Sequence, residues 1–135
     1  MEQPREYVAY PTRDEVCRLN KALIDTFGRG WMPPDNVSYN LPLDTILVEI
    51  QSSNPYGTVK SKAAALAFTI IEKQVFYDGN KRTGIQIAWE FIRANGLSLD
   101  LSENKSLEAL AEAIVYGESD YNTLLTWLHA HQEDH

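Results

Sequence analysis

The segment SKAAALAFTIIEK, residues 61–73, decides the fold class because it has the pattern of a helix that is apolar around most of its circumference. One face of this helix carries four apolar residues at three- and four-residue spacing: Ala63, Leu66, Ala67 and Ile70. The charged residues of the segment lie only near its two ends. A helix that is apolar on most sides is buried in the protein. We therefore expect residues 61–73 to form a central helix that other helices surround.

Five further segments have apolar residues at helical spacing and predict helices around this centre: residues 12–27, 42–50, 80–95, 106–116 and 119–129. Thr12 and Glu15 form a capping box at the start of the first of these helices. Gly28 and Gly96 suit left-handed helix ends. Strand patterns are weak, although residues 51–59 have the composition of a turn or short hairpin. The sequence predicts an all-α fold, a compact bundle of about six helices, and leaves open a short hairpin flap.

Composition and charge narrow the class of protein further. The length of 135 residues is typical of one domain, and no Pro-, Gly- or Ser-rich linker divides residues 1–135. The net charge of -7 disfavours non-specific contact with nucleic acid, so we expect no direct nucleic-acid partner. No apolar run reaches the ~18 residues of a membrane span, and no secretory signal begins the chain, so we expect no membrane partner. The single cysteine, Cys17, cannot form an internal disulfide, which favours a reducing, cytoplasmic location.

The segment KQVFYDGNKRT, residues 73–83, has a composition unlike the rest of the chain. It holds three cations and one acid, a local charge of +2 in a chain of net charge -7. Gly79 lies at the start of a predicted helix, where free N–H groups and the helix dipole attract anions. Lys81 and Arg82 in the first turn oppose that dipole unless an anion binds beside them. The segment is therefore either an anion site or an ordinary turn in which Asp78 caps the following helix.

The order of residues in this segment resembles the signature of the Fic/Doc family, and most closely that of its Doc (death-on-curing) branch. The family pattern is His-x-Phe-x-Asp/Glu-Gly/Ala-Asn-Gly/Lys-Arg, and the matching residues here are Phe76, Asp78, Gly79, Asn80, Lys81 and Arg82, followed by Thr83. The likeness extends over about residues 10–100. Members of this family are helical enzymes that move part of a nucleotide onto a protein hydroxyl. The resemblance implies ATP as substrate, Mg²⁺ as cofactor and Gly79 to Thr83 as the nucleotide-binding run.

The resemblance also implies a role for each residue, and each role is physically reasonable. Asp78 would hold Mg²⁺, a hard cation that prefers carboxylate and phosphate oxygens. Gly79 would let the backbone approach the phosphates, and the Asn80 side chain would hold a phosphate oxygen where charge develops. Lys81 and Arg82 would neutralise the polyphosphate, Arg82 through its forked geometry.

The residue at position 81 separates two reactions within the family. The branch that transfers AMP usually has Gly at this position, whereas the Doc branch has Lys, as here. The Doc branch is associated with a reversed nucleotide, whose γ-phosphate meets the target hydroxyl. A long cation in place of Gly fills space and adds charge where a phosphate would otherwise lie. Lys81 therefore favours phosphoryl transfer, and AMP transfer is the alternative.

Gln74 departs from the family pattern because the first position of the motif is normally His. In the family, that His is the general base for the target hydroxyl, and an amide has no useful pKa. Loss of a general base costs on the order of 10²–10⁴ in rate. The chain is then a disarmed version of a toxic enzyme, a natural member that kept binding and lost catalysis, or an enzyme with another base. The three histidines do not restore the motif, because they lie at the C-terminus: His129, His131 and His135.

The family resemblance also implies partners. A short flap before the alanine-rich helix docks the target protein by main-chain hydrogen bonds in this family, and Tyr56, Gly57 and Thr58 match its place or form an ordinary turn. The chain has no match to the family's inhibitory helix: the nearest segment, residues 45–49, is followed by Ile50, which breaks the pattern. Inhibition would then come from a separate antitoxin protein, as in the Doc branch. The target implied for that branch is a translation factor, elongation factor Tu.

Overall fold

The computed structural model describes residues 8–28, 30–38, 43–51, 57–102 and 104–133. These residues form six helices, and their only strand-like pairings are two isolated bridges. The helices are α1 (Arg13–Phe27), α2 (Leu43–Gln51), α3 (Val59–Lys73), α4 (Asn80–Ala94), α5 (Asn104–Val115) and α6 (Tyr121–Ala130). The prediction of an all-α bundle of about six helices is confirmed. No helix in the described ranges is long and apolar enough to cross a membrane.

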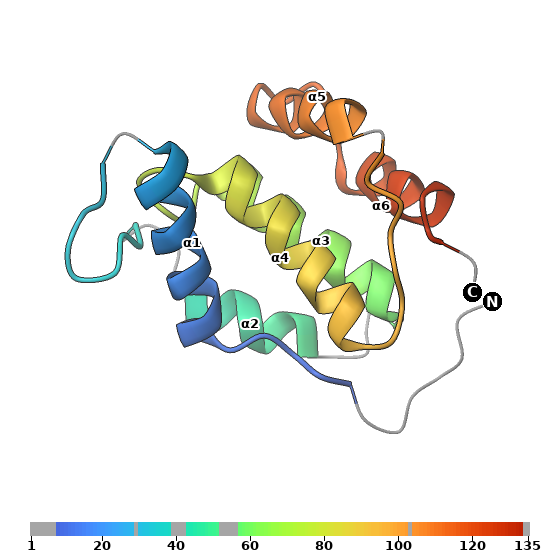
Figure 1. Ribbon diagram of the computed structural model, residues 1–135, viewed down its shortest axis with the longest axis horizontal. Helices are drawn as coiled ribbons and strands as arrows, with labels where there is room; N and C mark the ends of the chain where they lie inside the picture. The colour runs from blue at the N-terminus through green and yellow to red at the C-terminus, as the bar shows by residue number, and fades with distance from the viewer. Residues whose placement is uncertain (1–7, 29, 39–42, 52–56, 103, 134–135) are drawn as a thin grey trace.

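The helices α3 and α4 form the centre of the molecule and make its most extensive helix–helix contact (Figure 1). α1 packs against α4, α2 and α6 pack against α3, and α5 touches both members of the central pair. Figure 1 shows α1 and α2 on one side of the pair and α5 and α6 on the other. The loop that joins the two central helices lies at one end of the pair, close to the end of α1 (Figure 1).

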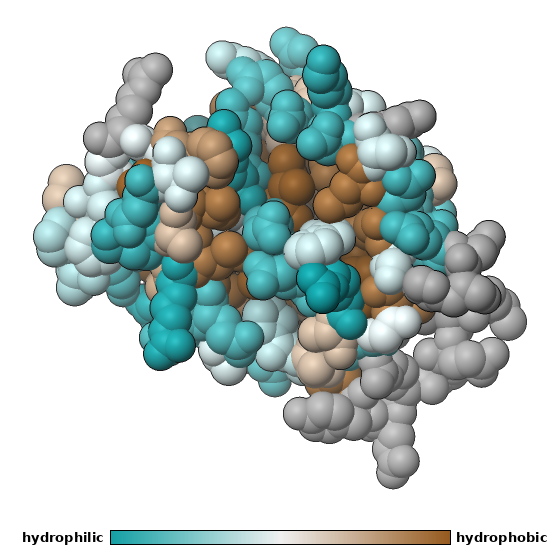
Figure 2. All heavy atoms as spheres, viewed as in Figure 1, coloured by the Kyte–Doolittle hydropathy of each residue, from teal (hydrophilic) through white to brown (hydrophobic). Residues whose placement is uncertain are grey.

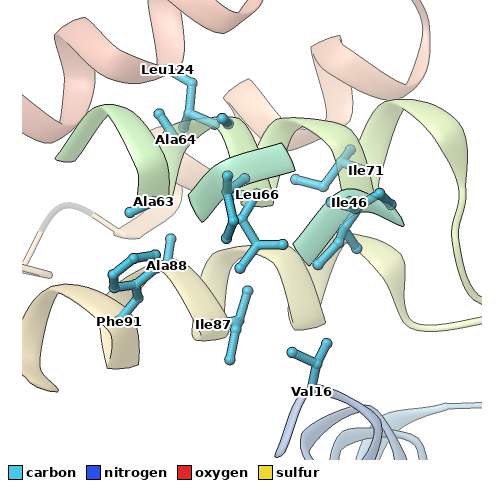
Figure 3. Packing of buried hydrophobic residues seen from close by; sticks show 14 of the residues in the cluster. Val16, Ile46, Ala63, Ala64, Leu66, Ile71, Ile87, Ala88, Phe91 and Leu124 are labelled. Carbon is cyan, nitrogen blue, oxygen red and sulfur yellow. The ribbon is translucent and has the colours of Figure 1, made fainter. Parts of the chain in front are cut away.

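Small side chains bring α3 and α4 close together. The run Ala63 to Ala67 on α3 is at most 3% exposed at any position. Figure 3 shows this helix facing Ile87, Ala88 and Phe91 of α4 across the core. Because alanines project little, the two backbones approach closely, and the larger Leu66 fills the space between the helices. The alanine-rich segment is thus buried as its pattern predicts.

The first turn of α3 is also buried, although it carries two lysines. Lys60 is 7% exposed and Lys62 is 4% exposed. The Lys62 ammonium donates to the carbonyl of Ile50 in the last turn of α2 at 2.7 Å and lies 5.4 Å from the Tyr10 ring centroid. A cation at the C-terminal end of a helix is favoured by the helix dipole. Lys62 therefore ties α3 to α2 instead of reaching into solvent.

Two local predictions are wrong. α3 begins at Val59 rather than at residue 61, because Thr58 and Ser61 form a capping box, so the end of the expected hairpin is helical. Residues 52–56 of that expected hairpin lie outside the described residues. Gly28 is extended (φ -85°, ψ 175°), not left-handed. A Cβ at Gly28 would lie 2.8 Å from Cα of Ile24. Glycine is therefore needed at this position because a side chain would clash with Ile24, and not because the backbone is left-handed. The left-handed Gly96 (φ 83°) is confirmed.

Gly84 provides a test of the close α3–α4 packing. A Cβ at this position would lie 2.9 Å from Cγ1 of Ile71 and 3.1 Å from the carbonyl oxygen of Ala67. Gly→Ala inside a helix normally stabilises by about 1 kcal/mol. We predict that Gly84→Ala instead destabilises the protein by about 1–3 kcal/mol in urea unfolding, because overpacking opposes the helix propensity. Gly30→Ala, with open space around the new Cβ, is the control and changes stability little. A more stable Gly84→Ala protein would contradict the packing.

Candidate active site

A cleft of about 290 Å³ lies where the α3–α4 loop meets the end of α1. One wall is formed by six of the residues that the sequence singles out: Gln74, Asp78, Gly79, Asn80, Lys81 and Arg82. The apolar side chains of Leu23, Ile24 and Phe27 on α1 form the facing wall. The rest of the lining consists of Gly28, Ile71, the exposed Tyr77 and Val115. The structure thus brings the motif residues together around one hollow.

The loop enters the core immediately after Gln74. Gln74 is the C-cap of α3 in the left-handed conformation (φ 50°, ψ 61°), and its own side chain is exposed. The next two residues, Val75 and Phe76, are at most 1% exposed. The sharp change of direction leaves Gln74 at the mouth of the cleft while Phe76 anchors the loop in the core.

The Asn80 side chain holds the loop closed. The N–H of Phe76 donates to Oδ1 of Asn80 at 2.9 Å, and Nδ2 of Asn80 donates to the carbonyl of Phe76 at 2.8 Å. These two bonds fix the peptide of Phe76 against the first residue of α4. A carboxamide carries a second N–H. The second N–H of Asn80 could still donate to a phosphate, and that contact stays a prediction. Holding the loop is an additional role of the Asn80 side chain.

Two buried asparagines hold the loop from the side of α1. Nδ2 of Asn20 donates to the carbonyl of Asp78 at 3.0 Å and to Oγ1 of Thr83 at 3.1 Å. Nδ2 of Asn36 donates to Oδ1 of Asn20 at 3.0 Å. All three side-chain partners, Asn20, Asn36 and Thr83, are at most 1% exposed. We call these three residues the asparagine cluster, and it joins α1, the 30–38 segment and α4 around the Asp78 carbonyl.

The asparagine cluster includes Thr83, whose contact with nucleotide stays a prediction, and it adds two residues that the motif does not contain. Thr83 lies beneath the loop on Asn20 and is not among the residues that line the cleft. Asn20 can be recognised in the sequence, because it is a polar residue on the face of α1 that Val16 and Ile24 also occupy. Asn36 has no such signal, because the contacts that join it to the cluster, with Asn20 and the Asp78 carbonyl, are distant in sequence.

Gly79 begins α4 in a conformation that suits glycine. Its φ of 80° is left-handed, and a Cβ would lie 3.0 Å from Nδ2 of Asn20 and 3.2 Å from Cγ1 of Ile24. Gly79, not Asp78, occupies the N-cap position, and it has no side chain with which to cap the first N–H groups of the helix. Amides at a helix start have no partner within the helix. They suit an anion in the cleft, which also offsets the placement of Lys81 and Arg82 in the first turn.

The two cations have different partners. The Lys81 ammonium forms an ion pair with Glu112 on α5. The Arg82 guanidinium lies 4.1 Å from the centroid of the exposed Phe27 ring at the end of α1. Neither Phe27 nor Glu112 was predicted as a site residue, since each lies on a helix far from the motif in sequence.

The donor set for a metal is small. In the described part of the chain, no group of three or more His, Cys, Asp or Glu side chains could hold a metal ion. Asp78 contributes a carboxylate to the cleft wall. Mg²⁺ is commonly bound through one or two carboxylates together with substrate phosphates. The site therefore fits Mg²⁺ that arrives with a polyphosphate, and not a metal held by protein ligands alone.

Other candidates lie outside the cleft. Thr58 caps α3 at the end of that helix opposite Gln74, about 22 Å away along 15 residues, and neither Gly57 nor Thr58 lines the cleft. Tyr56 lies outside the described residues, so the docking flap stays a prediction. The backbone that pairs with the cleft loop belongs to residues 30–38 and not to the expected flap. The N–H of Tyr77 donates to the carbonyl of Asn36 at 2.9 Å.

Cys17 does not have the surroundings of a nucleophile. It is half-buried on α1, and its Sγ accepts a hydrogen bond from Arg13 at 3.4 Å. Burial raises the pKa of the Cys17 thiol, and the nearby Arg13 charge opposes that rise only in part. A raised pKa lowers the thiolate fraction near neutral pH.

The described residues therefore form a helical bundle with a cleft at the start of a central helix, and Lys81 and Arg82 lie in the wall of that cleft. Compared with known families, the chain matches the model of the Fic/DOC family over residues 10–92. That match covers more than half of the chain, and the protein belongs to the Fic/DOC family. Members of the family generally transfer nucleotidyl or phosphoryl groups to proteins, with ATP and usually a divalent metal. No individual curated protein matches the chain.

The asparagine cluster can be tested by removing one member. Asn20→Ala leaves the Asp78 carbonyl and the Asn36 amide short of a buried partner, so we predict a loss of about 2–3 kcal/mol in urea unfolding. Thr26→Ala on the same helix removes only an exposed bond to Ala22 and is the control. Asn36→Ala combined with Asn20→Ala is expected to cost less than the sum of the single variants. Strict additivity would show that the two asparagines act independently.

Proposed function

We propose that this protein is a Doc-like toxin module of a toxin–antitoxin pair. It transfers phosphate from ATP to a Thr or Ser hydroxyl of a translation factor, elongation factor Tu by resemblance, and Gln74 impairs the reaction. The observation that carries the proposal is the single cleft wall on which Gln74, Asp78, Gly79, Lys81 and Arg82 lie together. Phosphoryl transfer depends mainly on positioning and charge stabilisation, which a small cleft with two cations and one carboxylate supplies.

Each residue of the wall has a defined task in this proposal. The Asp78 carboxylate and the phosphates together hold Mg²⁺, which supplies charge neutralisation during the transfer. The amides at the start of α4 donate to phosphate oxygens, because the glycine N-cap leaves them uncapped. Arg82 meets the polyphosphate with its orientation fixed by the Phe27 ring. Leu23, Ile24 and Phe27 exclude water from one side of the cleft.

In this proposal, Gln74 makes the protein a weak enzyme. Its side chain lies at the mouth of the cleft, where a target hydroxyl would enter. A carboxamide can orient that hydroxyl by hydrogen bonding but cannot take its proton. The expected loss relative to a histidine at this position is on the order of 10²–10⁴ in rate.

Restoring the base tests the proposal. We predict that Gln74→His, given ATP labelled on the γ-phosphate, labels elongation factor Tu at least 10²-fold faster than the unaltered protein does, because the imidazole accepts the hydroxyl proton. The acceptor gains the mass of one phosphoryl group. Gln86→His, which places the same side chain elsewhere on α4, is the matched control and leaves the rate unchanged. Label only from the α-phosphate would favour AMP transfer, and no label from either phosphate would contradict the proposal.

A second candidate function is a binding module that holds nucleotide or an antitoxin without turnover. The observation that favours it is Gln74 itself, since the residues that would bind phosphate are present and the base is not. This candidate predicts Mg²⁺-dependent ATP binding in calorimetry and no labelling by Gln74→His.

Under either function, Arg82→Ala should abolish ATP binding. Arg93→Ala, which removes a similar stack on Trp89 from the same helix, should not. Equal effects of the two variants would place the nucleotide outside the cleft.

The partners in the proposal follow from the family resemblance. A separate antitoxin chain would silence the protein, because the sequence lacks the inhibitory helix motif found in some relatives. Elongation factor Tu would be the target in the same, cytoplasmic compartment. A stable complex with a co-expressed antitoxin that prevents labelling of the target would support this part of the proposal.

A further inference from the structure

A second hollow, of about 300 Å³, adjoins the candidate cleft at Gln74. We call it the polar hollow, and it is lined by six residues: Ser38, Glu72, Lys73, Gln74, Phe76 and Tyr77. Two of them, Gln74 and Tyr77, also line the cleft. A polypeptide that brings a hydroxyl to Gln74 at the mouth of the cleft therefore also lies beside the polar hollow.

Backbone hydrogen bonds hold the walls of the polar hollow together. The N–H of Ser38 donates to the carbonyl of Val75 at 2.6 Å, and the N–H of Tyr77 donates to the carbonyl of Asn36 at 2.9 Å. These two bonds fix the 30–38 segment against the loop between α3 and α4. The polar hollow is thus formed by packed elements before any partner binds.

Two opposite charges stand at the end of α3 in the wall of the polar hollow. The Lys73 ammonium lies 3.3 Å from a carboxylate oxygen of Glu72, and the two side chains are 57% and 42% exposed. An apolar side chain entering the hollow would remove water from both charges without replacing its hydrogen bonds, which is costly. A polar side chain replaces those bonds, because a carboxylate accepts and an ammonium donates. The chemistry of the hollow therefore suits a polar side chain.

Exposed apolar surface is less informative about a partner of this protein. Figure 2 shows apolar side chains set among polar ones over one face of the molecule. A large part of any protein surface is apolar, so such surface does not by itself mark a contact. The polar hollow differs because its place beside Gln74 connects it to the hydroxyl that is modified.

The docking residues expected from the sequence do not reach this place. Thr58 caps α3 at the end opposite Gln74, about 22 Å away along the helix. An extended polypeptide advances about 3.3 Å per residue. A residue one or two positions from the modified hydroxyl therefore lies within about 7 Å of it, which is near enough for the polar hollow and too near for Thr58.

We propose that the polar hollow binds a polar side chain of the target protein, one or two residues from the hydroxyl that is modified. Glu72 and Lys73 are then specificity-determining residues that favour a polar neighbour and disfavour an apolar one. This inference rests on the proposed function, because it requires the hydroxyl to enter at Gln74. No bond forms or breaks in the hollow, so its effect falls on the binding of the target and not on the binding of ATP.

The test removes each charge of the hollow in the Gln74→His protein. Lys73→Met and Glu72→Gln should each raise the KM for elongation factor Tu about two- to fivefold, the range expected for an exposed charged contact. The kcat and the calorimetric affinity for Mg²⁺–ATP should stay unchanged, because the lost contact is made before and during the transfer alike. Lys105→Met and Glu118→Gln alter charge equally at exposed positions outside the hollow, and should leave the KM unchanged.

A second measurement changes the target instead. Mass spectrometry locates the modified hydroxyl, and the polar residues within two positions of it are replaced by alanine. This replacement should raise the KM of the Gln74→His protein by a similar factor, and should add little when Lys73→Met is also present, because the same contact is already lost. Fully additive effects, or a modified hydroxyl with only apolar neighbours, would overturn the inference.

The outcomes separate this inference from the proposed function. If Gln74→His labels the target but Lys73→Met and Glu72→Gln leave the KM unchanged, the polar hollow has no role and the proposed function stands. An equal rise in KM with Lys105→Met and Glu118→Gln, or a fall in kcat in place of a rise in KM, also overturns the inference. If Gln74→His labels no target, the proposed function fails and the inference fails with it.

Discussion

The inward-facing carbonyl of Asp78 is the constraint on which the site depends. A buried carbonyl needs a hydrogen-bond partner, because leaving it unpaired costs about 1–3 kcal/mol. Asn20 supplies that partner from α1, and Asn36 lies near enough to contribute a longer bond at 3.4 Å. With the carbonyl of Asp78 tied to the interior, the chain turns through the left-handed Gly79 directly into α4. The cleft exists because this turn is held in place.

The central helix pair supplies rigidity to the turn. α3 ends immediately before the loop and α4 begins immediately after it, so the loop spans the ends of the two most tightly packed helices. Phe76, 1% exposed, anchors the loop between them, and the Asn80 carboxamide holds the Phe76 peptide through both its N–H and its carbonyl. Functional groups placed on rigid elements keep their geometry. The side chains of Lys81 and Arg82 extend from this rigid frame into the cleft wall, where Glu112 and Phe27 are their respective partners.

Much of the architecture could be predicted from the sequence because it depends on local patterns. Helical spacing of apolar residues predicted all six helices, and the alanine-rich run predicted the buried centre. The errors lie at helix ends, where capping and local crowding decide. At Gly28 the backbone is extended, and a side chain is excluded by Ile24, while the helix α3 starts early because Thr58 caps it.

The candidate site was predictable only as far as its motif. The residues from Asp78 to Arg82 lie together in one cleft because they are neighbours in the sequence. Asn36, Phe27 and Glu112 contact the motif from 42, 55 and 31 residues away, counting to Asp78, Arg82 and Lys81 respectively. Such pairings depend on how α1, α4 and α5 pack, which no local pattern in a single sequence specifies.

The most direct measurement of the central claim is amide hydrogen exchange at Tyr77. Its side chain is 50% exposed, but its N–H donates to the carbonyl of Asn36 at 2.9 Å, beside the asparagine cluster. If the cluster holds the loop against α1, this N–H opens only with the core and exchanges as slowly as the amides of α3. Exchange at the rate of an unstructured peptide, while α3 stays protected, would contradict the account.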